Sequence, residues 1–167
     1  VECGTDVPCA ERVAASKRLW HLSERAGARL DAALARWCAS SLRREVCRHG
    51  LVRAEVPFFL AVDSSFGDYV EGAIDLLATD PDAPDALVVD YKTGDRALTL
   101  AEIEARHRMQ ANFYAYVLMQ CGMERVTCAF CCVELDAGEL GGTPGEPVVV
   151  RYAFDGKHQP RIGQTGG

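Results

Sequence analysis

Residues 87–94 constrain the fold of this chain more than any other stretch. Three apolar residues lead into Asp90, Tyr91 and Lys92, and the run stops at Gly94. Short apolar, β-branched runs closed by glycine are typical of buried strands. Because side chains alternate along a strand, we expect Asp90 and Lys92 on the same face, at the end of the strand.

Two further segments carry polar side chains that can join this pair. Residues 72–77, Gly-Ala-Ile-Asp-Leu-Leu, have the apolar character of a second strand, with Asp75 inside it. Residues 110–114, Gln-Ala-Asn-Phe-Tyr, lie in a segment expected to be helical. Gln110 and Tyr114 are four residues apart, so a helix brings them to one face.

The spacing of apolar residues predicts the order of the helices and strands. Helices are expected at 7–22, 24–38, 41–49 and 100–121, and strands at 51–62, 69–78, 86–92, 124–135 and 148–154. Ser23, Gly50 and Thr99 supply the expected N-cap, C′ residue and capping box. Residues 63–68 and 79–85 are expected to be a turn and an exposed loop. The order predicts an α/β fold with a mixed central β-sheet flanked by helices.

The length of 167 residues suits one domain with a sizeable core. Within it we expect a helical part at 1–50, an α/β core at 51–155 and a flexible tail at 156–167. No apolar run in the sequence reaches the ~20 residues that a membrane helix needs. The first dozen residues carry charges instead of the continuous apolar core of a signal peptide. These features predict a cytoplasmic location.

The net charge of −6 argues against a generally basic surface for nucleic acid. The charge is uneven, however. Residues 1–53 hold 10 Lys and Arg against 6 Asp and Glu, a net of +4, and the remainder holds 8 against 18, a net of −10. The basic segment can contact phosphates while carboxylates gather elsewhere, or its charges can simply be solvated helix faces.

Asp75 and Asp90 are candidate ligands of Mg²⁺ or Mn²⁺, because these hard cations prefer oxygen donors. The backbone carbonyl of Tyr91 is a third candidate ligand. Lys92 is a candidate catalytic cation that orients a water molecule or stabilises charge on a phosphate in the transition state. The alternative is an ion pair between Asp90 and Lys92 at a strand end, worth about 1 kcal/mol.

Gln110 and Tyr114 can hydrogen-bond phosphate or sugar, or they can support a catalytic carboxylate. The alternative is a helix whose tyrosine closes the core. Glu55, in the run Glu-Val-Pro-Phe, is expected as a half-buried acid of a strand, with Arg53 as a candidate partner.

Three motifs together resemble those of the PD-(D/E)XK nucleases, in the same order. They are Gly-x-x-Asp at 72–75, Asp-Tyr-Lys-Thr at 90–93 and Gln-x-x-x-Tyr at 110–114. Over residues 24–134 the chain looks most like the RecB/AddA group, the nuclease domains of bacterial recombination helicases. A Glu-x-Pro-Phe segment recurs in that group, which implies a supporting role for Glu55.

The resemblance implies a restriction-endonuclease-like core with Asp75, Asp90 and Lys92 as catalytic residues. It implies a Mg²⁺- or Mn²⁺-dependent deoxyribonuclease of the exonuclease V type that acts in DNA recombination and repair. It also implies a helicase segment or subunit as a partner, because this chain has no Gly-x-x-x-x-Gly-Lys-Ser/Thr loop of its own.

One position departs from the group's pattern. The group usually has a metal-binding histidine in an early helix, a few residues after a glycine. Here Asp31 stands at about that place after Gly27. Aspartate can ligate a hard metal, but its shorter side chain favours an alternative function. In this alternative the chain is a nuclease-like module with weak or no cleavage, which binds DNA or docks to a protein.

Some relatives bind an iron–sulfur cluster through cysteines, and Cys128, Cys131 and Cys132 are candidates for such ligands. These residues fall in an expected strand, whereas clusters favour loop cysteines with wider spacing. Cys128 and Cys132 share a face of that strand. The sequence therefore favours buried, unligated thiols over an iron–sulfur cluster or a zinc site.

Overall fold

The computed structural model describes residues 8–61, 69–95 and 98–156. Within these residues, five strands form one mixed sheet in the order β1-β2-β3-β4-β5. The strands are β1 (Leu51–Ala61), β2 (Tyr69–Asp80), β3 (Ala83–Lys92), β4 (Arg125–Asp136) and β5 (Pro147–Asp155). Neighbouring strands are antiparallel except for β3 and β4, which are parallel. The expected mixed sheet is therefore confirmed.

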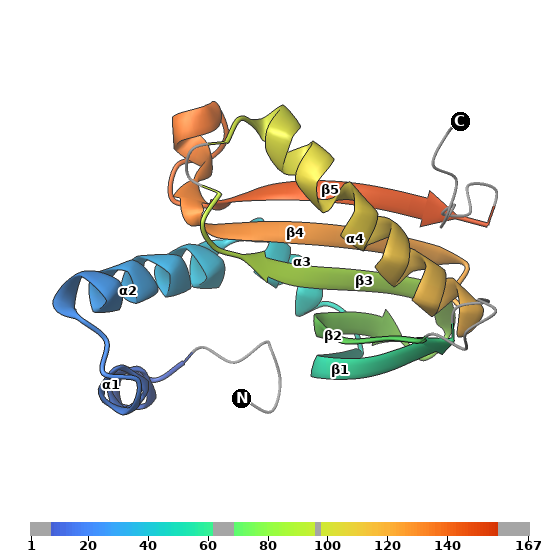
Figure 1. Cartoon of the computed structure of the whole chain (residues 1–167), viewed down its shortest axis with the longest axis horizontal. Coiled ribbons are helices and arrows are strands. Elements are labelled where there is room, and N and C mark those ends of the chain that lie inside the picture. Colours follow the sequence, from blue (N-terminus) through green and yellow to red (C-terminus); the bar gives the residue numbers. More distant parts are fainter. Residues whose placement is uncertain (1–7, 62–68, 96–97, 157–167) are drawn as a thin grey trace.

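Helices cover both faces of this sheet (Figure 1). The helix α4 (Leu100–Gln120) crosses one face, and α2 (Glu24–Ala39) and α3 (Ser41–Val46) lie on the other. The parallel pairing of β3 and β4 requires a crossover, and α4 is that crossover. The helix α1 (Ala10–Leu19) lies outside α2, and none of its residues, all of which the structure describes, is buried.

The helix starts follow from local capping. The Ser23 side chain accepts a hydrogen bond from the Ala26 N–H at 3.3 Å, as expected for the N-cap of α2. Thr99 and Glu102 form the expected capping box at the start of α4. The capping box thus fixes the residue at which α4 begins, ahead of Gln110 and Tyr114.

Buried side chains gather on each face of the sheet. On the α4 face, Phe130 and Ile103 are fully buried, together with Cys128 and Cys132. On the α2 face, Leu42, Val46 and Cys131 are fully buried. Burial raises the pKa of the thiols of Cys128, Cys131 and Cys132 to about 12, so they behave as small apolar residues. The expected burial of these cysteines is confirmed.

Three expectations about element ends are wrong. The first helix, expected to reach 22, ends at Leu19. The third helix ends at Val46 instead of reaching 49, and residues 79–85 are mostly strand instead of loop. The side chain of Asp80 accepts a hydrogen bond from the Gly50 N–H at 2.6 Å and lies 2.8 Å from His49 Nδ1. These bonds join the segment just before β1 to the end of β2. Because β2 pairs with β3 up to Asp80 opposite Ala83, the two strands turn over only two residues.

The expected turn at 63–68 and most of the expected tail at 156–167 lie outside the described residues. Among the residues that are described, no helix is long and apolar enough to cross a membrane.

Candidate active site

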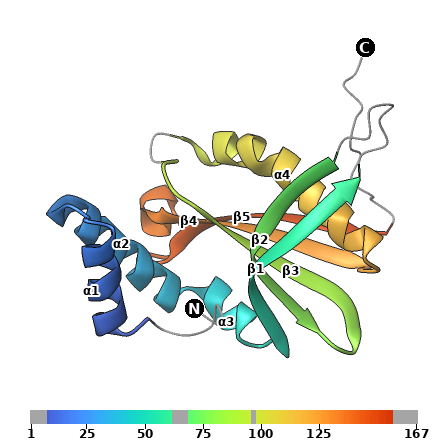
Figure 2. The same cartoon turned by 60° about the horizontal axis from the view of Figure 1, so that its bottom comes forward.

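The sheet divides at Asp75 and Asp90. The last pair between β2 and β3 on this side is Leu76 with Val89, and Asp75 and Asp90 are the next residues along. Beyond this point β3 stays paired with β4, whereas β2 continues only with β1 (Figure 2). Two carboxylates therefore stand where two strands separate, as a cleft for a ligand requires.

Asp75 closes the gap between the two strands. Its Oδ2 accepts a hydrogen bond from the Tyr91 N–H at 2.8 Å, which takes the place of a further sheet bond. Burial raises the pKa of the Asp75 carboxyl, the Tyr91 bond opposes this, and the charges of Asp90 and Glu55 raise the pKa further. The ionised carboxylate of Asp75 is thus held near other negative charges, which a cation would neutralise.

Asp90 is buried, and the structure gives its carboxylate three side-chain partners. Oδ1 lies 2.7 Å from Lys92 Nζ. Oδ2 accepts hydrogen bonds from Gln110 Nε2 at 2.8 Å and from the Tyr114 hydroxyl at 2.9 Å. Burying a carboxylate is costly unless it is paired and hydrogen-bonded, and this environment supplies both conditions.

Gln110 connects the members of this network. Its Oε1 accepts a hydrogen bond from Lys92 Nζ at 2.9 Å, and its Nε2 also donates to the Tyr114 hydroxyl at 2.6 Å. Burial and the neighbouring Asp90 raise the pKa of the Tyr114 phenol well above its ordinary value, so the hydroxyl stays a donor. Of the two roles considered for Gln110 and Tyr114, the geometry fits support of a carboxylate.

A cavity of about 470 Å³ opens beside Asp75 and Glu55. Its other wall is apolar and comes mainly from α2, with Leu30, Ala33, Leu34 and Trp37. Glu55 is exposed, not half-buried as expected, and has the unusual backbone angle φ of 51°. The β1–β2 pairing runs to Ala54 and resumes at Val56, so the chain turns out of the regular ladder at Glu55.

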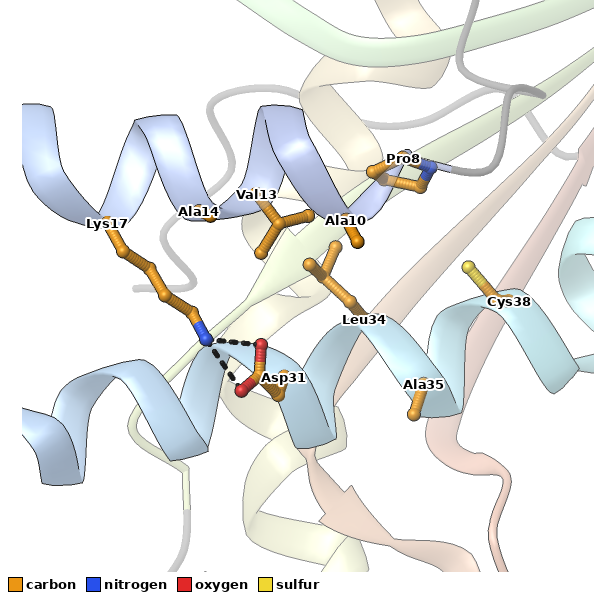
Figure 3. Close-up of a pocket in the computed structure, with 9 residues that line it drawn as sticks. All are labelled: Pro8, Ala10, Val13, Ala14, Lys17, Asp31, Leu34, Ala35 and Cys38. Atoms are coloured by element: carbon orange, nitrogen blue, oxygen red, sulfur yellow. Dashed lines mark hydrogen bonds and ion pairs between the residues drawn. The ribbon is translucent and has the colours of Figure 1, made fainter.

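Asp31 lies in a different environment. Figure 3 shows Lys17 of α1 reaching Asp31 of α2, with Nζ 2.6 Å from the carboxylate. Asp31 lines a second cavity of about 460 Å³ between the two helices, which adjoins the cavity of Asp75 at Pro8 and Leu34. Leu30, its neighbour on α2, lines the cavity of Asp75 instead. The structure therefore brings Asp75, Asp90, Lys92, Gln110 and Tyr114 together, with Glu55 beside Asp75, and leaves Asp31 facing α1.

The sequence did not predict that Asp95 and His107 are buried next to this network. Asp95 lies 3.0 Å from His107 Nε2 and accepts a hydrogen bond from Arg106 at 2.6 Å. The His107 ring stacks on the Phe130 ring, with 5.0 Å between the ring centres. Lys92 Nζ lies 5.4 Å from the centre of the Phe130 ring. The available signal was the helical spacing of three between His107 and Gln110, which puts both on the sheet-facing side.

The sequence pattern of the PD-(D/E)XK nuclease superfamily matches residues 4–152. This chain belongs to the PD-(D/E)XK nuclease superfamily. No protein of curated function matches the chain. The match covers most of the molecule, including β2, β3 and α4, so the resemblance that rested on three short motifs extends to a whole PD-(D/E)XK fold.

PD-(D/E)XK nucleases typically use Mg²⁺ or Mn²⁺. The donors present here, the carboxylates of Asp75 and Asp90, fit such hard cations. Among the described residues, no three His, Cys, Asp or Glu side chains converge on one point, so a closed protein cage is not formed. Mg²⁺ usually keeps several waters and is bound through one or two carboxylates.

Proposed function

We propose that this protein is a Mg²⁺- or Mn²⁺-dependent deoxyribonuclease that hydrolyses phosphodiester bonds at the point where β2 and β3 separate. One observation carries the proposal: in a chain of this superfamily, Asp90 and Lys92 share a hydrogen-bonded network with Gln110 and Tyr114, next to Asp75. An ordinary ion pair at a strand end would not need two further side chains from a helix.

Asp75, Asp90 and the Tyr91 carbonyl are the proposed metal ligands. The Tyr91 N–H fixes Oδ2 of Asp75, and Gln110 and Tyr114 fix Oδ2 of Asp90. Oδ1 of Asp90 lies 2.7 Å from Lys92 Nζ and, with two lone pairs, can accept a second contact. A bound divalent cation supplies charge neutralisation at the scissile phosphate and a more acidic water.

Lys92 is the proposed catalytic cation. An ammonium group has three N–H donors, and two of them are directed to Asp90 Oδ1 and Gln110 Oε1. The third is left for the attacking water or a phosphate oxygen. Because its orientation is already fixed, Lys92 stabilises developing negative charge without reorganisation during the reaction. Water adds to phosphorus, an ester P–O bond breaks, and a phosphate end and a hydroxyl end result.

We also propose the RecB/AddA type of nuclease, with a helicase segment or subunit as partner and a role in DNA recombination and repair. The order and spacing of Gly72-x-x-Asp75, Asp90-Tyr91-Lys92-Thr93 and Gln110-x-x-x-Tyr114 support this assignment. Glu55 has a supporting role, next to Asp75 in the same cavity.

A second candidate is a nuclease-like module that binds DNA or docks to a protein with little cleavage. The observation in its favour is Asp31, whose carboxylate is engaged by Lys17 at 2.6 Å and faces α1 instead of the Asp75 cavity. If Asp31 is to serve as a metal ligand, this ion pair must break.

The test is a digest of linear and covalently closed circular DNA with Mg²⁺, Mn²⁺ or EDTA. We expect metal-dependent cleavage by the parent protein and none by Asp90→Asn or in EDTA. Loss of linear DNA alone indicates exonuclease action, and nicking of circles indicates endonuclease action. A folded parent protein that cuts neither DNA with either metal would favour the docking module.

A further inference from the structure

The arm formed by the outer halves of β1 and β2 needs support after it leaves β3. Residues 69–74 of β2 pair only with β1, so this part of the sheet is two-stranded (Figure 2). Isolated two-stranded ribbons are marginal in stability. Phe58 is one of the side chains that tie the arm to the α4 face, together with Val56 and Ile74, and it lies opposite Gly72 across the arm.

Gly72 makes room for the ring of Phe58. A Cβ atom at position 72 would lie 2.6 Å from Phe58 Cζ, 3.0 Å from Cε1 and 3.3 Å from Cε2. The backbone angle φ of Gly72 lies outside the left-handed region, so alanine fits the backbone itself. The obstacle to a side chain at position 72 is therefore the ring of Phe58, which lies across the strand.

The ring of Phe58 in turn contacts the helix residues that reach the site. It lies 5.4 Å from the ring of Phe113 and 6.0 Å from that of Tyr114, the latter edge to face at 82°. The Tyr114 hydroxyl donates to Asp90 Oδ2 at 2.9 Å and lies 3.5 Å from the carbonyl oxygen of Ala73. Phe58 thus packs against the body of Tyr114 while the hydroxyl of Tyr114 contacts Asp90.

We propose that Phe58 is a positioning residue, whose ring, admitted by Gly72, holds Tyr114 in the orientation that brings its hydroxyl to Asp90. This role rests on the proposed nuclease function, because it concerns the same site. The proposal gives a role to Gly72 of the Gly-x-x-Asp motif and to Phe58 of the Glu-x-Pro-Phe segment. The other site residues of these two motifs are Asp75 and Glu55. Phe58 touches neither Asp90 nor Lys92 in this role and acts through Tyr114.

The first test is a double-mutant cycle with Gly72→Ala and Phe58→Ala. Gly72→Ala should lower kcat by about tenfold or more with a smaller change in KM, because small misplacements of catalytic groups act on the transition state. In the Phe58→Ala background the clash is gone, so Gly72→Ala should cost nothing further in kcat and should not lower Tm. Equal losses in both backgrounds would overturn the proposal.

Two further variants separate positioning from general stability. Phe59→Ala is the matched control, because Phe59 is the next residue of β1 and its side chain is exposed. It should leave kcat unchanged. In a Tyr114→Phe background the hydroxyl is already missing, so Phe58→Ala should add little to the loss of kcat. A full additional loss there would mean that Phe58 does not act through Tyr114.

A readout without DNA keeps this inference separate from the proposed function. The protein is labelled with 3-fluorotyrosine, and the ¹⁹F resonance that disappears in Tyr114→Phe is that of Tyr114. It should shift in Gly72→Ala and in Phe58→Ala and stay in place in Phe59→Ala. If the parent protein cuts no DNA, the proposed function is wrong, but the ¹⁹F shifts of Tyr114 still test the positioning role of Phe58. An unmoved Tyr114 resonance in Gly72→Ala overturns the inference, whatever the activity of the parent.

Discussion

Gln110 donates from Nε2 to Asp90 and accepts at Oε1 from Lys92, so one amide orients both members of the Asp-x-Lys motif. Lys92 and Asp90 are also in direct contact at 2.7 Å. Acid, amine and amide therefore form one closed unit at the end of β3. Residues that act as one unit have non-additive effects on catalysis.

Gln110→Ala should lower kcat by about tenfold to a hundredfold, because a hydrogen bond to a charged group contributes roughly 1.5–3 kcal/mol. If the main contact of Gln110 were with the DNA backbone, its removal would raise KM instead. Steady-state cleavage rates over a range of DNA concentrations separate the two cases. Gln120→Ala, at the exposed end of α4, is the control and should match the parent.

Asp95 should stabilise the fold in a pH-dependent way. Burial acts to raise the pKa of its carboxyl, but hydrogen bonds from His107 and Arg106 lower it below the ordinary value. A carboxyl with a lowered folded-state pKa stabilises the protein above its unfolded pKa, near ~3.9, and this contribution is lost as the pH falls through the folded pKa.

Asp95→Asn should therefore lower the free energy of unfolding at pH 7 by about 1–3 kcal/mol, and the deficit should shrink below about pH 4. Urea denaturation at a series of pH values measures this. Asp82→Asn, in the exposed turn between β2 and β3, is the control and should follow the parent. A deficit that stays constant down to pH 2 would mean that the Asp95 charge is not responsible.

Asp75→Asn should stabilise the protein in the absence of metal. Burial raises the pKa of the Asp75 carboxyl, and the charges of Asp90 and Glu55 add to this, so the ionised form costs stability at neutral pH. Asparagine keeps an oxygen that can accept the Tyr91 N–H. Thermal unfolding in EDTA should give a higher Tm for Asp75→Asn, and added Mn²⁺ should raise the Tm of the parent more than that of the variant. Equal Mn²⁺ shifts would exclude Asp75 as a ligand.

Glu55 should tolerate glycine better than alanine. Its φ of 51° lies in the left-handed region, where residues with a Cβ are strained by roughly 1–2 kcal/mol. At an ordinary strand position, glycine is instead the less stable of the two. We expect Glu55→Gly to exceed Glu55→Ala in stability by about 1 kcal/mol in urea denaturation. The reverse order would show that residue 55 has regular strand geometry in solution.

The sequence predicted those features that follow from short-range patterns. The run into Asp90 and Lys92, the capping box at Thr99 and the spacing of Gln110 and Tyr114 each lie within a few residues, and the structure agrees with them. The extension of β2 to Asp80 comes instead with pairing to β3 and a bond to Gly50, 30 residues away. The partners of Asp31 and Phe58 are likewise set by how elements pack, which no local pattern contains.

The most direct test of the central claim is cleavage by Lys92→Ala under single-turnover conditions, with Mn²⁺ affinity measured on the same sample. In this account the Lys92 ammonium stabilises negative charge in the transition state and is not a metal ligand. The variant should therefore lose about a hundredfold or more in cleavage rate and bind Mn²⁺ about as well as the parent. If Lys92→Ala cuts DNA as fast as the parent, the contact between Asp90 and Lys92 is only a strand-end ion pair, and this account of the site is wrong.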